Sequence, residues 1–267
     1  MRRDASPSPS NADDVATKDY PAAVDTVRDL SGAESVQMVA HCYGSTSFVM
    51  AMLAGLQGVR SAVCSQIATN MKVPRATGIK TGLHIPALLD ALGVDSLTAY
   101  AGDRPDWRDR LYDTALNVYP IGHEERCDSA TCRRITFMYG PLYEHDQLSA
   151  ETHDALGELF GVASITSFEH LARMARAGHV VDAGGHEAYM PHLERLARPI
   201  TFLHGSENLC FLPESTEITL NVLRERNGDD LYARHVIPNY GHIDCIFGKN
   251  ADTDVYPHVL RHLEATL

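Results

Sequence analysis

The stretch "VQMVAHCYGSTSF", residues 36–48, decides the fold that we expect for this chain. Its first five residues, Val36 to Ala40, form a short apolar run that is typical of a buried strand. The residues from Thr46 to Leu56 are apolar and rich in Met, Ala and Leu, which predicts a buried helix. Between them lies a turn built from small residues, so the pattern predicts a strand that turns sharply into a helix with Cys42 at the tip.

The rest of the chain repeats this alternation of strand and helix. Further strands are expected within residues 59–68, 199–205 and 231–238, and further helices within residues 13–32, 215–226 and 254–267. Strands separated by helices pair in parallel through right-handed crossovers, which places ligand sites outside the carboxyl ends of the strands. We therefore expect an α/β fold with about four parallel strands and flanking helices.

The composition along the chain predicts three kinds of segment. Residues 1–12 are rich in Ser, Pro, Asp and Asn, which favours a disordered tail. Residues 13–69 and 186–267 carry the strand and helix alternation and are expected to form one α/β core. Residues 70–185 are irregular and helical in pattern, and we interpret them as an inserted cap or lid.

Charge and hydropathy exclude several classes of partner. The formal net charge of -12 opposes extended contact with phosphate backbones, so nucleic acid is not expected as a partner. No apolar run approaches the roughly 20 residues that a membrane span needs, and the first residues lack the apolar stretch of a signal peptide. A cytoplasmic location is the default expectation.

Cysteine and histidine spacing does not predict a metal site. The six cysteines are scattered, and Cys127 and Cys132 are separated by four residues without a matching second pair. His186 and His192 in "HEAYMPH" lie six positions apart, which is not the helical spacing of a zinc motif. We therefore expect no disulfide framework, no metal and no cofactor.

Three polar clusters fall at expected strand ends: "AHCYG" (40–44), "HGSENLCFLPEST" (204–216) and "NYGHIDCIFG" (239–248). In this order they resemble the nucleophile elbow, the acid loop and the histidine loop of the α/β-hydrolases. The resemblance is greatest to acid-lipase-like members, and to the hydrolase regions fused behind cholesterol-oxidase-like flavoproteins of the glucose-methanol-choline group. It covers residues 13–267 and implies a partial α/β-hydrolase fold with a helical cap.

The resemblance implies three catalytic residues. Cys42 takes the position of the nucleophile, His242 that of the base, and Asn208 that of the acid, where the family has Asp. A serine nucleophile loses about 10⁴ in rate when the Asp behind its histidine becomes Asn. A cysteine can instead ionise beforehand, helped by the start of the following helix, and then needs only a neutral group to hold the ring. The two departures from the family pattern therefore fit each other.

Further residues take supporting positions in the same pattern. Tyr43 N–H is the expected oxyanion donor, and Gly44 closes the turn. Glu207 and Asp244 are alternative carboxylates to orient the histidine. His41 is expected to line the pocket or to serve a structural role.

The elbow strand comes early in the chain compared with the family pattern. The first half of the α/β-hydrolase fold, with its second oxyanion donor, is expected to be missing. Such a chain would leave the strand Val36 to Ala40 as a bare apolar edge, which pairs or aggregates unless it is covered. A homo-oligomer or a partner chain is therefore expected to cover this edge.

Three functional hypotheses follow. The first is a cysteine-nucleophile esterase, thioesterase or acyltransferase that acts on a bulky apolar acyl substrate such as a lipid, sterol or polyketide. The second is a non-catalytic binding or regulatory subunit, associated with a partner such as a flavin oxidoreductase. The third is a fragment of a fused enzyme without an independent role. The first is favoured because Cys42, Gly44 and His242 hold mutually consistent positions.

Overall fold

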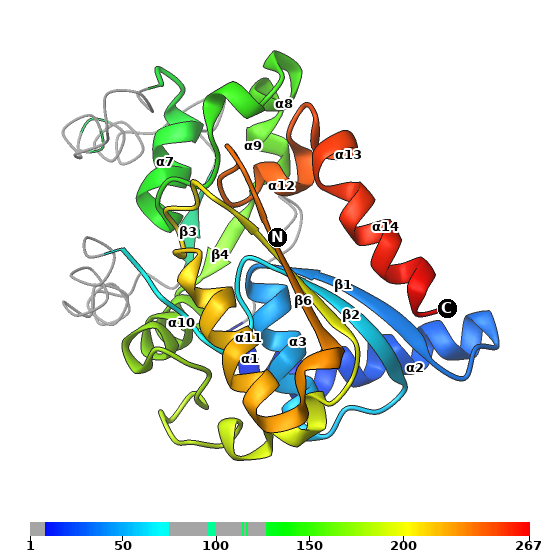
Figure 1. Ribbon diagram of the computed structural model, residues 1–267. Coiled ribbons are helices and arrows are strands. Elements are labelled where there is room, and N and C mark those ends of the chain that lie inside the picture. The colour runs from blue at the N-terminus through cyan, green and yellow to red at the C-terminus, as the bar shows by residue number, and fades with distance from the viewer. Residues whose placement is uncertain (1–8, 75–95, 100–113, 115, 117–126) are drawn as a thin grey trace.

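The computed structural model describes residues 9–74, 96–99, 114, 116 and 127–267, and its centre is a parallel sheet (Figure 1). The strands are β1 (Val36–His41), β2 (Val59–Ser65), β5 (Ile200–Gly205) and β6 (Tyr232–Ile237). They lie in the order β1-β2-β5-β6, and each neighbouring pair is parallel. The expected α/β fold with four parallel strands is confirmed.

The chain enters the sheet through a helical segment with clear local signals. It comprises α1 (Ala12–Asp14), the π-helix η1 (Val15–Asp19) and α2 (Tyr20–Ser31). The helix ends at Gly32, whose φ of 69° is the left-handed conformation that glycine adopts without penalty. Asn11 caps the start, and Ala12 is fully buried. The disordered tail expected over residues 1–12 therefore does not include Asn11 and Ala12, which belong to this helical segment. Residues 1–8 lie outside the described part of the chain.

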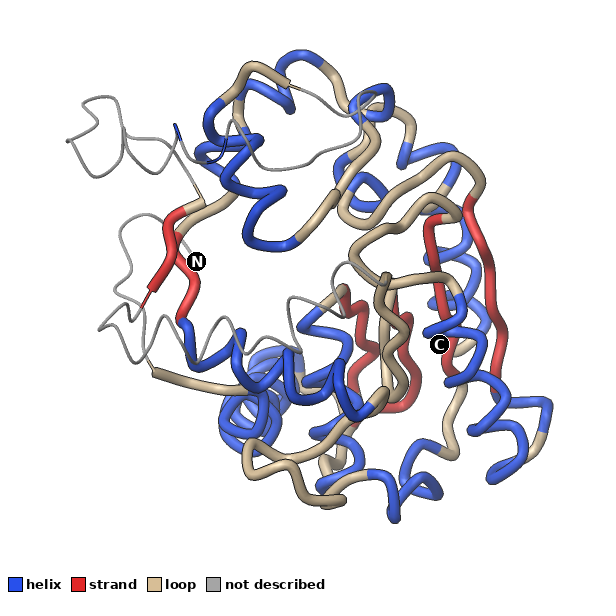
Figure 2. The backbone as a smooth tube through the Cα atoms, turned by 90° about the vertical axis from the view of Figure 1, so that its left-hand side faces the viewer, coloured by secondary structure: helices blue, strands red, loops and turns tan. Residues whose placement is uncertain are grey.

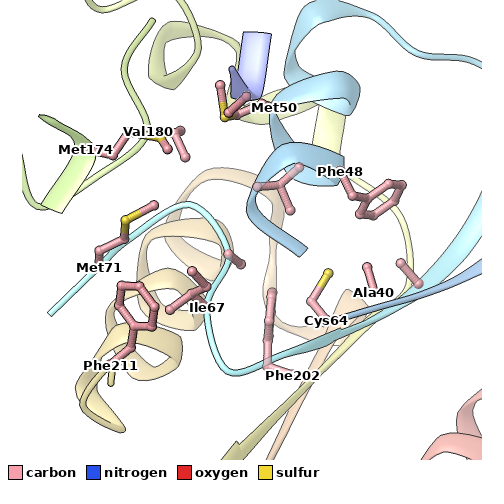
Figure 3. Close-up of a cluster of buried hydrophobic side chains, with 14 of the residues drawn as sticks. Ala40, Phe48, Met50, Cys64, Ile67, Met71, Met174, Val180, Phe202 and Phe211 are labelled. Atoms are coloured by element: carbon pink, nitrogen blue, oxygen red, sulfur yellow. The ribbon is translucent and has the colours of Figure 1, made fainter. Parts of the chain in front are cut away.

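Helices cover both faces of the sheet. α3 (Tyr43–Ala54) and α11 (Glu214–Asn227) lie on one face, and α14 (Tyr256–Ala265) lies on the other (Figure 1). Alternating strand residues reach the two sides, so that Cys64 joins the core beneath α3 while Val63 joins the core beneath α14. Figure 3 shows the first core, where Phe48 and Met50 of α3 lie among side chains from several segments.

Short elements complete the core. They are η4 (Met190–Leu196), the 3-10 turn η5 (Asp229–Leu231), α12 (Asp244–Phe247) and α13 (Ala251–Asp254). α12 begins directly in the predicted histidine loop, so this loop leads from β6 into the helices that reach α14.

The segment expected to form a cap is only partly described. It contains a small antiparallel pair, β3 (Ser96–Thr98) with β4 (Val162–Ser164), which Figure 2 shows apart from the main sheet. Its helices are α7 (Ala130–Tyr139), η3 (His145–Gln147), α8 (Ala150–Asp154), α9 (Leu156–Leu159) and α10 (Ile165–Ala177). α7, α8 and α9 lie together at one end of the molecule, near α12 (Figure 1). The cap boundaries, residues 70–185, remain a prediction.

Within the described residues, no helix has the length and apolar character that a membrane span requires.

Candidate active site

The turn between β1 and α3 has the geometry that the sequence predicts for a nucleophile elbow. Cys42 adopts φ 54° and ψ -127°, a combination that non-glycine residues rarely occupy. Its N–H donates to Ser65 O of β2 at 3.0 Å, and its carbonyl accepts from Thr46 N of α3 at 3.1 Å. Hydrogen bonds from β2 and α3 therefore hold the strained backbone of Cys42 in place. Such backbone strain costs about 1–3 kcal/mol and persists only where the surrounding structure enforces it.

The thiol at the tip of the elbow is neutral in the resting site. Cys42 keeps some accessible surface, but burial raises the pKa of its thiol to about 12, and the N–H of Tyr43 opposes this rise only in part. The expectation that the start of the following helix ionises this thiol is therefore wrong. The desolvation of the thiolate outweighs the helix dipole, whose contribution is typically about 0.3–1 kcal/mol.

The predicted base, His242, lies in the loop that follows β6. It is 1% exposed, its N–H donates to Leu142 O, and its carbonyl accepts from Gln66 Nε2. Burial, and then the neighbouring His41 and His204, hold the pKa of its ring well below the usual value. Its Nε2 atom has no hydrogen-bond partner among the described residues, so the expected thiolate–imidazolium pair is not formed.

Asn208 stands beside the histidine, as predicted for the acid position, but it presents the opposite end of its amide. Its Nδ2 lies 2.9 Å from Nδ1 of His242. Its Oδ1 accepts from the N–H groups of Cys210 and Phe211, at 2.9 and 3.0 Å, while Nδ2 also donates to Gln66 Oε1 at 2.8 Å. These partners identify which atom of the Asn208 amide is oxygen and which is nitrogen. Asn208 therefore donates a hydrogen bond to the ring of His242 instead of accepting one from it.

This contact fixes the tautomer of His242. A neutral imidazole has one N–H and one acceptor nitrogen, and Nδ1 is the acceptor here. The hydrogen therefore resides on Nε2, the unpartnered nitrogen. In this state the ring can donate a hydrogen bond to a bound molecule but cannot remove a proton from Cys42.

The sequence reasoning missed Gln66, which joins the loops of the site. It follows β2 directly, is fully buried and has a φ of 78°. Its Oε1 accepts from Gly205 N and from Asn208, and its Nε2 donates to the carbonyl of His242. Gln66 is a polar residue directly after a buried strand, at the carboxyl end of the sheet. This position in the sequence could have identified it as a residue of the site.

Gly205 at the end of β5 allows the histidine loop to approach closely. A Cβ atom at this position would overlap the carbonyl oxygens of Gly241 and Tyr240. Only glycine therefore lets the backbone before His242 pass over the end of β5.

Two further histidines surround the base. The ring of His41 lies 4.9 Å from that of His242, centroid to centroid, and its Nδ1 pairs with Ser65 Oγ. His204 is fully buried, and its ring nitrogens lie within hydrogen-bond distance of Phe211 O and Thr216 Oγ1. Burial lowers the pKa of His41 to about 3 and that of His204 to about 4, so both rings are neutral.

The alternative carboxylates do not orient the histidine. Glu207 is exposed and accepts from Ser206 Oγ. Asp244 is buried, which raises the pKa of its carboxyl, and it accepts from the N–H groups of Gly241 and Glu144 at 2.8 and 3.2 Å. Asp244 therefore fixes the shape of the histidine loop, while among the described residues Asn208 is the one that contacts Nδ1 of the ring.

A second cluster of reactive side chains lies in the region expected to form the cap. Cys127, Cys132, His145 and His153 each offer one sulfur or nitrogen atom, and these atoms all lie within 4.8 Å of one another. The expectation of no metal site rested on the lack of a second ligand pair near the two cysteines, and the two histidines supply that pair.

Comparisons with known proteins identify the fold. No protein-family model and no curated protein matches the sequence. Among solved structures, a lipase in its open form has a TM-score of 0.59 at 12% identity, covering 96% of this chain and 74% of its own. A Mycobacterium tuberculosis H37Rv protein assigned as a non-heme bromoperoxidase has a TM-score of 0.56 at 12% identity, covering 100% and 80%. A protein of Acinetobacter baumannii AYE assigned as a lipase has a TM-score of 0.51 at 9% identity, covering 96% and 69%.

These likenesses agree with the parallel sheet and its flanking helices. The chain has the α/β-hydrolase fold.

Proposed function

We propose that this protein is an acyl-transfer enzyme that acts on an ester or thioester through Cys42. The observation that carries the proposal is the strained elbow, which holds Cys42, a partly exposed non-glycine residue, at φ 54°. The fold, shared with structures assigned as lipases, supports ester or thioester chemistry.

The proposed reaction has two steps. The sulfur of Cys42 bonds to the carbonyl carbon of the substrate, the bond from that carbon to the leaving oxygen or sulfur breaks, and the thiol proton ends on the leaving group. Water, an alcohol or a thiol then attacks the acyl-cysteine, gives its proton to the departing sulfur, and restores the thiol. The N–H of Tyr43 faces the developing oxyanion, and His242 donates from Nε2 to the carbonyl or leaving atom.

The resting protonation states make this reaction slow near neutral pH. The Cys42 thiol is neutral, and the ring that should accept its proton carries a hydrogen on the required nitrogen. In serine enzymes, a catalytic histidine held in the wrong tautomer lowers the rate by about 10⁴. Turnover is therefore expected to depend on the small thiolate fraction and to rise with pH.

Aromatic side chains support an apolar acyl substrate. Burial, and then the charges of Cys42 and Cys210, raise the pKa of Tyr139 to about 12. The ring of Tyr139 packs on those of Phe160 and Phe168. This surface suits a bulky acyl group of a lipid, sterol or polyketide.

A non-catalytic binding role is the second candidate, and the amide of Asn208 favours it. The donated hydrogen bond removes the proton-accepting ability of His242 while the fold around it stays intact. In that case the chain would bind an apolar ligand beside a partner such as a flavin oxidoreductase, the kind of protein that the sequence resemblance suggests.

We also propose that β1 is covered in the working assembly. β1 ends the sheet among the described strands, and Val39 on it is 50% exposed. Val39 and Leu260, which is 55% exposed, line one apolar cavity of about 340 Å³. The cavity lies on the sheet face beneath α14, whereas the edge position of β1 itself favours pairing, either with a second copy of this chain or with a partner chain.

Trapping of the acyl-enzyme tests the proposed function. The full chain is incubated with p-nitrophenyl butyrate or a butyryl thioester, quenched in acid and digested for mass spectrometry. We expect the butyryl group on the peptide that contains Cys42, and no such adduct in Cys42→Ala. Cys245→Ala is the control, because Cys245 is a fully buried thiol in the core on the α14 side of the sheet. An absence of acylation at every pH up to 10 would favour the binding role.

A further inference from the structure

We propose that Cys127, Cys132, His145 and His153 form a structural zinc site that braces the histidine loop. The proposal is independent of the acyl-transfer function, since it concerns side chains outside the elbow and its loops. It rests on the positions of the four ligand atoms, on the donors around the sulfurs, and on the contacts of the segment between the ligands.

The four ligand atoms have the spacing of a tetrahedral site. Cys127 Sγ lies 3.3 Å from His153 Nε2, and Cys132 Sγ lies 3.3 Å from His145 Nε2. All four atoms lie within 4.8 Å of one another. Zinc bonds of about 2.3 Å to sulfur and about 2.0 Å to nitrogen place the corners of a tetrahedron about 3.3 to 3.8 Å apart. Small rotations of the side chains therefore bring all four atoms into contact with one ion.

Each of the two sulfurs accepts a hydrogen bond from a group outside the ligand set. Ser129 N–H donates to Cys127 Sγ at 3.3 Å, and Tyr143 O–H donates to Cys132 Sγ at 3.0 Å. Hydrogen bonds from second-layer groups are typical of metal-bound ligands, because they stabilise the negative sulfur and fix its orientation. Neither cysteine forms a disulfide.

The ligands come from separate elements and leave no position open for a substrate. Cys127 precedes α7, Cys132 lies in its first turn, and His145 and His153 belong to η3 and α8. Two thiolates and two imidazoles select Zn²⁺ over the hard cations, and four protein ligands are the mark of a structural site. The spacing, with gaps of four, twelve and seven residues, differs from that of a zinc finger.

The segment between the ligands packs directly against the histidine loop. Leu142 O accepts from the N–H groups of both His242 and Ile243, and Glu144 N donates to Asp244. These contacts lie between Cys132 and His145 in sequence. A metal ion that fixes both ends of this segment therefore fixes the backbone on which His242 depends.

Metal analysis of the full chain tests the site. We expect one equivalent of Zn²⁺ by mass spectrometry of the purified protein, released by a chelator together with faster hydrogen exchange in residues 142–145 and 240–247. Titration of the metal-free chain with Co²⁺ should give the visible bands of a tetrahedral complex and a thiolate-to-cobalt charge-transfer band. His153→Ala should weaken Co²⁺ binding at least about tenfold.

His186→Ala is the control, because His186 is an exposed histidine that lies beside Asp182 and outside the cluster, and it should leave Co²⁺ affinity unchanged. His153 has the same kind of neighbour, Asp154, at 3.9 Å. Failure of the folded wild-type chain to bind either ion stoichiometrically would overturn the proposal. So would a Co²⁺ complex without the charge-transfer band, or equal affinity in His153→Ala, Cys127→Ser and the wild type.

Discussion

Replacing Asn208 with Asp should convert the slow site into a faster one. The carboxylate accepts a hydrogen bond from Nδ1–H of His242, so the ring changes tautomer and Nε2 becomes free to accept the proton of Cys42. The tautomer is worth about 10⁴ in rate in serine enzymes, or about 5.4 kcal/mol. A charged neighbour also raises the pKa of the histidine, which favours a thiolate–imidazolium pair.

The same substitution has a structural cost that lowers the gain. The new oxygen faces Gln66 Oε1, which now accepts from Asn208 at 2.8 Å, and Gln66 cannot turn without losing Gly205 N and His242 O. One such unsatisfied contact costs about 1–3 kcal/mol. We therefore expect Asn208→Asp to raise the rate by about 10² to 10³, with a lower melting temperature.

The assay is steady-state hydrolysis of p-nitrophenyl butyrate at pH 7.5. Cys42→Ala is made in the wild type and in Asn208→Asp, so that hydrolysis that does not depend on Cys42 can be subtracted. Asn208→Leu is the control of similar volume that neither donates nor accepts. The reasoning is refuted if folded Asn208→Asp is no faster than the wild type, or if its gain survives in the Cys42→Ala background.

Three further outcomes are expected. Iodoacetamide labelling of Cys42 should rise about tenfold per pH unit from pH 6 to 10, because the pKa of the thiol is about 12; a plateau near pH 7 would contradict the neutral thiol. Gly205→Ala should lower both stability and turnover, since the backbone before the histidine must shift; unchanged values in calorimetry and in the ester assay would remove this role. The amides of Val36 to Ala40 should exchange slowly in an assembled state seen by analytical ultracentrifugation; an active monomer with free exchange there would argue against a covered edge.

Acid should also destabilise the fold through the buried histidines of the site. The pKa values of His41, His204 and His242 are lowered in the folded state, so the unfolded chain binds more protons below about pH 6.5. Folding stability is therefore fully present above that pH and falls as pH decreases, by up to about 1.4 kcal/mol per pH unit for each ring. Urea unfolding from pH 7 to 4.5 measures this slope, and a flat profile would mean that the rings are protonated in the folded protein.

The sequence by itself determined the order of strands and helices and the position of the elbow. Apolar runs of strand length, a small-residue turn at Cys42 and a glycine stop at Gly32 are local signals, and the strands and helices predicted for the core formed where these signals lie. It also predicted that the three polar clusters would meet, because the carboxyl ends of parallel strands lie on one edge of the sheet.

Only the tertiary structure decided the chemistry at that edge. The protonation of Cys42 depends on how far it is removed from water, and the direction of the Asn208 amide depends on backbone groups and on Gln66 from another strand end. The partners of Cys127 and Cys132 come from helices that follow them at irregular spacing. Burial, amide orientation and the grouping of four sulfur and nitrogen atoms within 4.8 Å are properties of distances in space, and no local pattern of residues encodes them.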